Sequence, residues 1–478
     1  MGQKEKKFRL QDFGIWFLVL LCTLVLITLC FDEGLDYDEA YSWHTTYRNS
    51  FAGVWQAILD DHDTDIPLWY WCLKVWVAIF GESWFVYKLF SVMGTLATMI
   101  LGATAVRRIW GNKTAVLFII SVSLSPALLH NSVNVRMYSW TVFLITACGV
   151  LVYWMSDRTR KLWMWILLGF LTVVGLFCHY FTAFCYLFLY LFLLIRVFLQ
   201  NKKESCKVIA CGVIALIPFL IWLIIFDFFH LVGGGAAPGV SKTELKEIFQ
   251  YLFETEVEYS VLLGTGVFAV AIAGVVLLGK KFEKWEKYFV LMSLVMTPLI
   301  FGVMGYVSSV SYHFFTPRHV LHSAGLMWLG IAIVLSRINV MSYLCGLLFV
   351  GSMGASAYEK SYHVEYETTP YMAETKALIA ERMEPGDIII FNAETSFGLV
   401  YDYYLREQQL VHVSQVNLEE LAGKPVWFLD ATGKHLSEEQ LKGWELAYEQ
   451  IDGIYGFRQS DNNTFFQVYK LDIKEPKE

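Results

Sequence analysis

Long apolar runs, repeated along most of the chain, are the feature that most restricts how this sequence can fold. Between Gly14 and Ala357, stretches of about twenty apolar residues recur, and each is long enough as a helix to cross about 30 Å of hydrocarbon. Only 17% of the 478 residues are charged, whereas soluble proteins carry about 25%. The chain is therefore predicted to be a polytopic α-helical membrane protein, which excludes a purely soluble enzyme.

Eleven segments are predicted to span the membrane. They are residues 12–31, 84–106, 114–130, 136–156, 161–179, 181–200, 206–228, 261–279, 288–306, 318–336 and 339–357. A further apolar piece, Pro67–Phe80, is shorter and contains Lys74, and its tryptophans suit the membrane interface. We expect this piece to lie at the outer surface as a juxtamembrane helix.

The distribution of Lys and Arg between the predicted loops sets the orientation of the chain. When Pro67–Phe80 does not cross, the basic clusters all fall on one side, as the positive-inside rule requires. These clusters lie at residues 4–9, 107–113, 158–161, 202–207 and 280–287 and at Arg337. We therefore expect a multi-pass protein of the cell membrane with a cytoplasmic N-terminus and an extracytoplasmic C-terminal part.

The residues after Tyr358 change in character, since they are charged and rich in turns. They predict a second domain, 358–478, that is soluble and extracytoplasmic, beside a membrane domain at 1–357. Short β-rich runs (387–391, 409–413, 426–429, 465–471) alternate with helix-like stretches (371–383, 396–406, 437–448), the pattern of a small α/β fold. Ser437 and Gln440 have the spacing of a capping box. No catalytic motif occurs here, so we expect a packing or acceptor-binding role.

The charge of the chain excludes one class of partner. A net charge of −7 argues against binding to nucleic acid, which needs a concentrated basic surface. The expected surroundings are instead the lipid bilayer.

The first predicted outer loop is strongly acidic. Residues 32–66 contain nine carboxylates and a single arginine, Arg48. The pair Asp38-Glu39 begins an amphipathic stretch that would hold these carboxylates at the membrane surface, where one of them can act as a general base. Three Asp-x-Asp patterns in this loop would suit a divalent cation, but so many acids also produce such patterns by chance. We assign no metal ligand and no certain cofactor.

Cationic and aromatic residues gather at outer ends of the predicted spans. Arg136-Met137-Tyr138, His179-Tyr180 and Pro317-Arg318-His319 all lie there. Each has an ordinary explanation when taken alone, because arginine can extend to lipid headgroups and histidine can bond a backbone carbonyl. Together with Asp38 and Asp65 on the same side, they indicate a functional site. Arg and His could hold a membrane-anchored phosphate while a carboxylate takes the proton of an acceptor hydroxyl.

The order of these elements resembles the GT-C superfamily of integral membrane glycosyltransferases, specifically the branch containing protein O-mannosyltransferases and the bacterial aminoarabinose transferase of lipid A. The resemblance covers residues 12 to about 357. In chain order, the motifs that carry it are Asp38-Glu39-Ala40, Asp65-Ile66-Pro67-Leu68-Trp69-Tyr70, Arg136-Met137-Tyr138, His179-Tyr180 and Pro317-Arg318-His319. The chain departs from the family pattern at Asp65-Ile66, where a basic or imidazole group and a proline are more usual, and at His319, where tyrosine is common.

The resemblance implies a reaction and a set of roles. The donor would be a polyprenyl-phosphate sugar, transferred with inversion to a hydroxyl of a protein, lipid or cell-wall glycan. Asp38, in an outer catalytic loop at 32–82, would be the general base, and Glu39 would orient either the substrate or Asp38. Arg136, His179 and Arg318 would lie near the lipid phosphate. The other substrate-binding residues would be Asp65, Tyr70, Tyr138, Tyr180 and His319.

Two other classes of function stay open beside this one. The chain could be a different lipid-phosphate transferase, or a membrane transporter or flippase of a lipid-linked or polar substrate. Transporters place polar residues near the bilayer midplane and often consist of repeated halves. Here the ionisable residues gather at one outer face and no internal repeat is visible, which favours the glycosyltransferase.

Overall fold

The chain folds as two compact units. Unit 1 comprises Met1–Phe31 and Phe51–Ser361, and unit 2 comprises Asp32–Ser50 and Tyr362–Glu478. The computed structural model describes residues 10–31, 34–60, 66–225, 245–255, 258–310, 316–393, 397–441, 444–457 and 464–474. The domain limits expected from the sequence, 1–357 and 358–478, stay a prediction. The structure adds that the first part of the acidic loop groups with the C-terminal residues.

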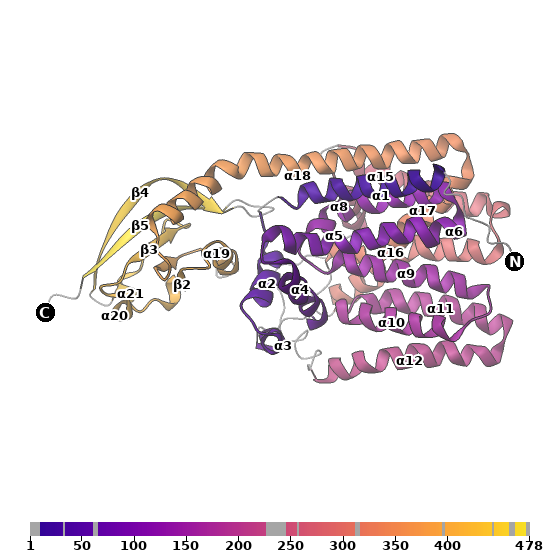
Figure 1. The fold of residues 1–478 in the computed structure, drawn as a ribbon, viewed down its shortest axis with the longest axis horizontal. Coiled ribbons are helices and arrows are strands. Elements are labelled where there is room, and N and C mark those ends of the chain that lie inside the picture. The colour runs from indigo at the N-terminus through magenta and orange to yellow at the C-terminus, as the bar shows by residue number, and fades with distance from the viewer. Residues whose placement is uncertain are drawn as a thin grey trace. The chain divides into compact units, whose positions relative to one another are not determined.

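Unit 1 is helical, and its long helices run alongside one another (Figure 1). The α-helices are α1 (Leu10–Leu29), α3 (Phe51–Asp60), α4 (Pro67–Phe80), α5 (Trp84–Leu101), α6 (Arg107–Trp110), α7 (Asn112–Leu124), α8 (Pro126–Val133), α9 (Tyr138–Ser156), α10 (Leu162–Cys178), α11 (Thr182–Gln200), α12 (Lys202–Ile225), α14 (Leu245–Phe253), α15 (Ser260–Leu277), α16 (Lys284–Val310), α17 (Leu321–Ile338) and the first part of α18 (Val340–Arg382). Short helical turns lie at η1 (Gly102–Val106), η2 (Gly279–Lys281) and η3 (Pro317–Val320).

The predicted membrane spans are confirmed as helices, but fewer than eleven of these helices are long and apolar enough to cross a membrane. Among the described residues, eight helices are long and apolar enough to cross a membrane, or nine if α7 and α8, bent by 61°, form one span. Each of the eleven predicted segments coincides with a helix, but the apolar helices Phe13–Leu29 and Leu162–Cys178 are shorter than the other spans. Pro126 begins α8 directly after the bend, because proline lacks the N–H that would continue α7 and favours a helix start.

Helix α17 forms the centre of unit 1 and packs against α9. Within its apolar stretch, 94% of the residues are buried. It contacts α9 closely, since a Cβ at Gly325 would lie 2.2 Å from the Thr146 hydroxyl. Helix α5 approaches the start of α9 in the same way, because a Cβ at Gly94 would lie 2.7 Å from the backbone nitrogen of Trp140. Helix α9 is therefore held by α5 near its beginning and by α17 near its middle.

Unit 2 contains a five-stranded mixed sheet in the order β2-β1-β3-β5-β4. Strands β1, β2 and β3 pair in parallel, and β5 is antiparallel to both β3 and β4. All residues of β1 and β3 are buried, as expected for central parallel strands covered on both faces. The elements are α2 (Tyr37–Tyr47), β1 (Ile388–Phe391), α19 (Gly398–Tyr404), β2 (Gln409–His412), η5 (Val413–Gln415), α20 (Leu418–Leu421), β3 (Val426–Asp430), α21 (Glu438–Leu441), β4 (Glu445–Phe457) and β5 (Thr464–Lys474), with the end of α18.

One element of this unit was predicted wrongly. A helix was expected over 437–448, but α21 ends at Leu441 and Glu445–Phe457 is strand β4. Pairing with β5 explains the difference, because Tyr448 lies opposite Leu471 in the sheet and this long-range contact overrides the local preference. The capping box is confirmed: the Ser437 N–H donates to Gln440 Oε1 at 2.9 Å, and the Gln440 N–H donates to Ser437 Oγ at 3.4 Å.

Candidate functional site

The carboxylate pair Asp38-Glu39 lies in the first turn of α2. Asp36 is the N-cap, and its side chain accepts a hydrogen bond from the Glu39 N–H at 2.7 Å. Glu39 is 4% exposed and returns the interaction by accepting from the Asp36 N–H at 3.1 Å. Asp38 is half-buried and stands between these two capping residues. The arrangement gives Glu39 a direct role in holding the turn that carries Asp38, at a helix end that favours negative charge.

The amphipathic stretch expected after Asp38 is divided between two helices. Helix α2 ends at Tyr47 and belongs to unit 2, whereas α3 begins at Phe51 and belongs to unit 1. Asp65 lies outside the described residues, as do Asp61 and Asp63, which form two of the three Asp-x-Asp patterns (Asp61-His62-Asp63 and Asp63-Thr64-Asp65).

In unit 1, Arg136 is buried instead of extending toward lipid headgroups. It lies between α8 and α9 and is 7% exposed. Its Nη1 donates a hydrogen bond at 3.2 Å to the hydroxyl of Tyr70, a fully buried residue in the first turn of α4. A guanidinium is rarely held this deeply, which separates Arg136 from an ordinary surface arginine.

Three imidazole rings lie next to one another beside this arginine. The ring centroid of His179 is 4.3 Å from that of His322 and 5.5 Å from that of His319. His179 occupies the break between α10 and α11, and its Nδ1 accepts the Phe181 N–H at 3.2 Å. His319 Nδ1 accepts the Thr316 N–H at 3.1 Å. Because Nδ1 accepts in both rings, the proton of each neutral imidazole is on Nε2, where it can be donated.

The cluster is electropositive and bordered by aromatic rings. Arg136 and Arg318 both lie close enough to His179 to interact with it electrostatically. The Tyr180 ring stacks on His179 at a centroid distance of 4.8 Å, and the Tyr138 ring lies 6.0 Å from it. The predicted residues that unit 1 brings together are Tyr70, Arg136, Tyr138, His179, Tyr180, Arg318 and His319. Two guanidinium groups and several N–H donors in one buried region suit a phosphate.

Sequence reasoning missed one member of this cluster. His322 is 1% exposed, and its Nδ1 lies 2.8 Å from the Thr141 hydroxyl. Within the described part of the chain, its Nε2 has no hydrogen-bond partner. The signal was available, because His322 follows His319 by three residues and such a spacing places two side chains on one face of a helix.

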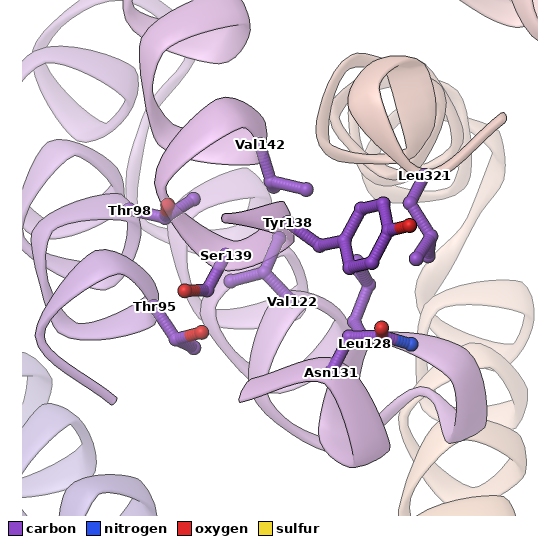
Figure 2. A pocket seen from close by; sticks show the side chains of 9 residues that line it. All are labelled: Thr95, Thr98, Val122, Leu128, Asn131, Tyr138, Ser139, Val142 and Leu321. Carbon is purple, nitrogen blue, oxygen red and sulfur yellow. The ribbon is translucent and has the colours of Figure 1, made fainter. Parts of the chain in front are cut away.

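A small cavity lies behind Tyr138, between α5, α7, α8, α9 and α17. Figure 2 shows the threonine and serine hydroxyls of α5 and α9 on one side and the Tyr138 ring on the other. Its free volume of about 10 Å³ is close to the space that a single water molecule needs. The cavity is therefore far too small for a sugar or a lipid headgroup.

The structure offers no preformed metal centre in the part of the chain that it describes. Within those residues, no group of three His, Cys, Asp or Glu side chains is arranged to hold a metal ion. The arginines beside the three imidazoles also make this cluster a poor place for a cation.

Comparison with known proteins gives a family match over part of the chain and a fold match over nearly all of it. Residues 63–224 match the family model described as dolichyl-phosphate-mannose-protein mannosyltransferase. No curated protein matches the sequence. The fold is similar to that of ArnT from Cupriavidus metallidurans bound to undecaprenyl phosphate, with 10% identity, a TM-score of 0.64 and coverage of 96% of this chain and 98% of that chain.

Other solved structures are also similar. The apo state of the same ArnT has a TM-score of 0.64 at 11% identity, over 96% of this chain and 98% of that chain. An oligosaccharyltransferase from Archaeoglobus fulgidus, in complex with zinc and sulfate, has a TM-score of 0.46 at 12% identity, over 94% of this chain and 75% of that chain. The first of these likenesses establishes the fold, and the second is too remote to support an argument about function.

Proposed function

We propose that this chain is a multi-pass membrane glycosyltransferase that moves a sugar from a polyprenyl-phosphate donor to a hydroxyl group. The proposal is supported by the match of residues 63–224 to the family model described as dolichyl-phosphate-mannose-protein mannosyltransferase and by the long apolar helices. The transfer takes place on the outer face of the cell membrane and inverts the anomeric carbon. The acceptor is a protein, a lipid or a cell-wall glycan. The positive-inside distribution of the basic loops supports the outer face.

The observation that carries this proposal is the buried cluster of arginines and histidines in unit 1. When the sugar leaves, negative charge accumulates on the phosphate of the polyprenyl carrier. The guanidinium groups of Arg136 and Arg318 stabilise that charge, and the Nε2–H groups of His179 and His319 donate hydrogen bonds to its oxygens. Such donors are worth more in a buried site than in water, because the surrounding dielectric is low.

Asp38 acts as the base that removes the proton of the acceptor hydroxyl. The acceptor oxygen attacks the anomeric carbon, the bond from that carbon to the phosphate oxygen breaks, and the acceptor proton passes to the Asp38 carboxylate. Polyprenyl phosphate leaves with the electron pair of the broken bond. A single displacement of this kind inverts the anomeric centre, and it needs only one base because phosphate is already a good leaving group. The Asp36–Glu39 capping box keeps the turn that bears Asp38 in place.

The proposed function is tested by transfer from defined donors. The full-length protein in liposomes is incubated with radiolabelled polyprenyl-phosphate hexoses and pentoses, and with the matching diphosphates. We expect sugar release from at least one monophosphate donor, to an added acceptor or slowly to water, and none from the diphosphates. If the protein is folded and the donors are incorporated but no monophosphate donor releases sugar, the proposal is contradicted. Uptake into sealed vesicles is then the next measurement.

His322 is expected to recognise the sugar and not the phosphate. The Thr141 hydroxyl donates to the Tyr138 carbonyl at 2.8 Å and therefore accepts a hydrogen bond from the His322 Nδ1–H, which leaves Nε2 as a buried acceptor. A sugar hydroxyl is the partner that a glycosyl donor supplies, and one such bond is worth about 0.5–1.5 kcal/mol. His322→Phe keeps the ring volume and should raise the KM for the sugar donor about three- to tenfold.

The control measurement for this variant is competitive inhibition by undecaprenyl phosphate, which carries the phosphate but no sugar. We expect its inhibition constant to be unchanged by His322→Phe. An equal loss of affinity for both molecules would show that His322 contributes to phosphate binding or to the fold, and not to sugar recognition.

A further inference from the structure

A helix of the C-terminal sheet domain holds the helix that carries Asp38. The Asp402 carboxylate, in α19, lies 2.8 Å from His44 Nδ1 and accepts a hydrogen bond from Arg48 Nη2 at 2.7 Å. Arg48 Nε donates to the same carboxylate at 3.3 Å, and Arg48 Nη2 also donates to the Arg406 carbonyl at 3.1 Å. His44 and Arg48 are four residues apart, so they share one face of α2. Both ends of that face are therefore bonded to a single carboxylate.

Aromatic packing extends this contact. Trp43 is fully buried, and its ring meets that of Tyr403 edge-on at a centroid distance of 5.2 Å. The neighbouring Tyr401 is also fully buried and packs against Phe391 of β1 and Phe457 of β4, at 5.3 Å in each case. Helix α19 is thus fixed to the core of the sheet, and α2 is fixed to α19.

Helix α2 depends on such support. It has 11 residues, and isolated helices of fewer than about 12–15 residues are marginal in water. Its first turn is stabilised by the Asp36–Glu39 capping box, whereas its last turn has a backbone cap and, in addition, the Asp402 contact. The two ends of α2 are therefore stabilised by different devices, one local and one from a segment more than 350 residues away, since 358 positions separate His44 from Asp402.

The ionisation of Asp402 agrees with this role. Burial acts to raise the pKa of its carboxyl, but the hydrogen bonds from His44 and Arg48 and the charge of Arg48 outweigh burial and hold the pKa below its ordinary value. The fold therefore favours the ionised carboxylate. Its contribution is fully present above the ordinary aspartate pKa and is lost only as the pH falls through the lowered value.

We propose that Asp402 is a positioning residue for sugar transfer: through His44 and Arg48 it fixes α2, and with it the orientation of Asp38. At about 100° per residue, Asp38 lies about 120° around the helix from His44. The contact of α19 with His44 therefore lies on a different side of α2 from Asp38. The C-terminal domain then takes part in catalysis, beyond the packing or acceptor-binding role expected from its sequence. This inference rests on the proposed role of Asp38 as the base.

The test separates positioning from binding. Asp402→Ala, Arg48→Ala and the double variant are assayed in the full-length protein for kcat, for donor KM and for inhibition by undecaprenyl phosphate. Because a displacement of about 1 Å can cost about 10²-fold in rate, we expect Asp402→Ala to lower kcat 10- to 100-fold. Donor KM and the inhibition constant should stay within about twofold. The double variant should be no slower than the slower single variant, since both changes break one interaction.

Two further variants serve as rescue and control. Exchanging the charges, with Arg48→Asp and Asp402→Arg together, should restore only part of the lost kcat, because the ion pair is regained whereas the hydrogen bond between His44 and residue 402 is not. Asp472→Asn removes an exposed carboxylate of the same unit, with 68% of its side chain accessible, and should leave kcat unchanged. If Asp402→Ala does not fold, as judged by gel filtration and thermal unfolding, Asp402→Asn of nearly equal volume replaces it.

Several results would overturn this inference. The first is a normal kcat in the Asp402 variants. The second is a loss of undecaprenyl phosphate affinity as large as the loss of kcat. The third is a loss of kcat in the double variant that equals the product of the losses in the two single variants. Asp38→Asn is assayed in parallel. If it is inactive while Asp402→Ala is fully active, only the positioning role fails; if Asp38→Asn is itself active, the proposed base is wrong.

Discussion

Replacing Asp38 with asparagine should lower the rate of sugar transfer about 10²- to 10⁴-fold, the range in which loss of a general base usually falls. The amide has nearly the volume of the carboxylate and can still occupy the first turn of α2, but it cannot accept the proton of the acceptor hydroxyl. The capping box should survive, because it is formed by Asp36 and Glu39. We therefore expect normal folding and membrane insertion, normal affinity for undecaprenyl phosphate, and a loss confined to kcat.

The measurement is a single-turnover transfer assay with the donor that the wild-type protein uses. Glu39→Gln provides an informative comparison, because glutamine can still accept the Asp36 N–H and should retain much more activity than Asp38→Asn. Asp472→Asn controls for the loss of one negative charge in unit 2. Transfer by Asp38→Asn at a rate within about threefold of wild type would remove Asp38 from the role of base.

The membrane part of the fold could be predicted from the sequence because each span is encoded by a run of consecutive apolar residues. About twenty apolar residues in a row can satisfy their backbone groups in lipid only as a helix, so every predicted segment is helical. The residues of the cationic cluster could be found for a similar reason. Arg136, His179 and Arg318 interrupt apolar stretches at helix ends, where a charge needs an explanation.

Features that depend on contacts between residues far apart in the sequence could not be predicted in this way. Strand β4 exists because β5 pairs with it, and its own residues resemble a helix once the capping box at Ser437 has begun one. The grouping of α2 with unit 2 depends on the contact between Arg48 and Asp402, two residues that look like ordinary surface charges in the sequence. His322 was missed because it lies within an otherwise apolar helix, although its spacing from His319 was informative.

The second large effect is expected at Arg136, through donor affinity rather than through the proton transfer. A guanidinium can form two parallel hydrogen bonds with a phosphate, and bonds to a charged partner are worth about 1.5–3 kcal/mol each. Arg136→Gln should therefore raise the donor KM and the inhibition constant of undecaprenyl phosphate by about 10²-fold or more. Arg136→Lys keeps the charge but loses the planar fork, and should fall between the wild type and Arg136→Gln.

The contact with Tyr70 allows the charge of Arg136 to be separated from its orientation. Tyr70→Phe removes the hydroxyl that accepts from Arg136 Nη1 but leaves the guanidinium in place, so we expect a KM increase of only a few-fold. Arg108→Gln removes an exposed arginine of the same unit and should change neither constant. Because Asp38 acts on the acceptor, the Arg136 variants should show their loss in undecaprenyl phosphate binding, whereas Asp38→Asn shows none. Unchanged affinity in folded Arg136→Gln would place the donor phosphate elsewhere and separate the histidine cluster from the reaction.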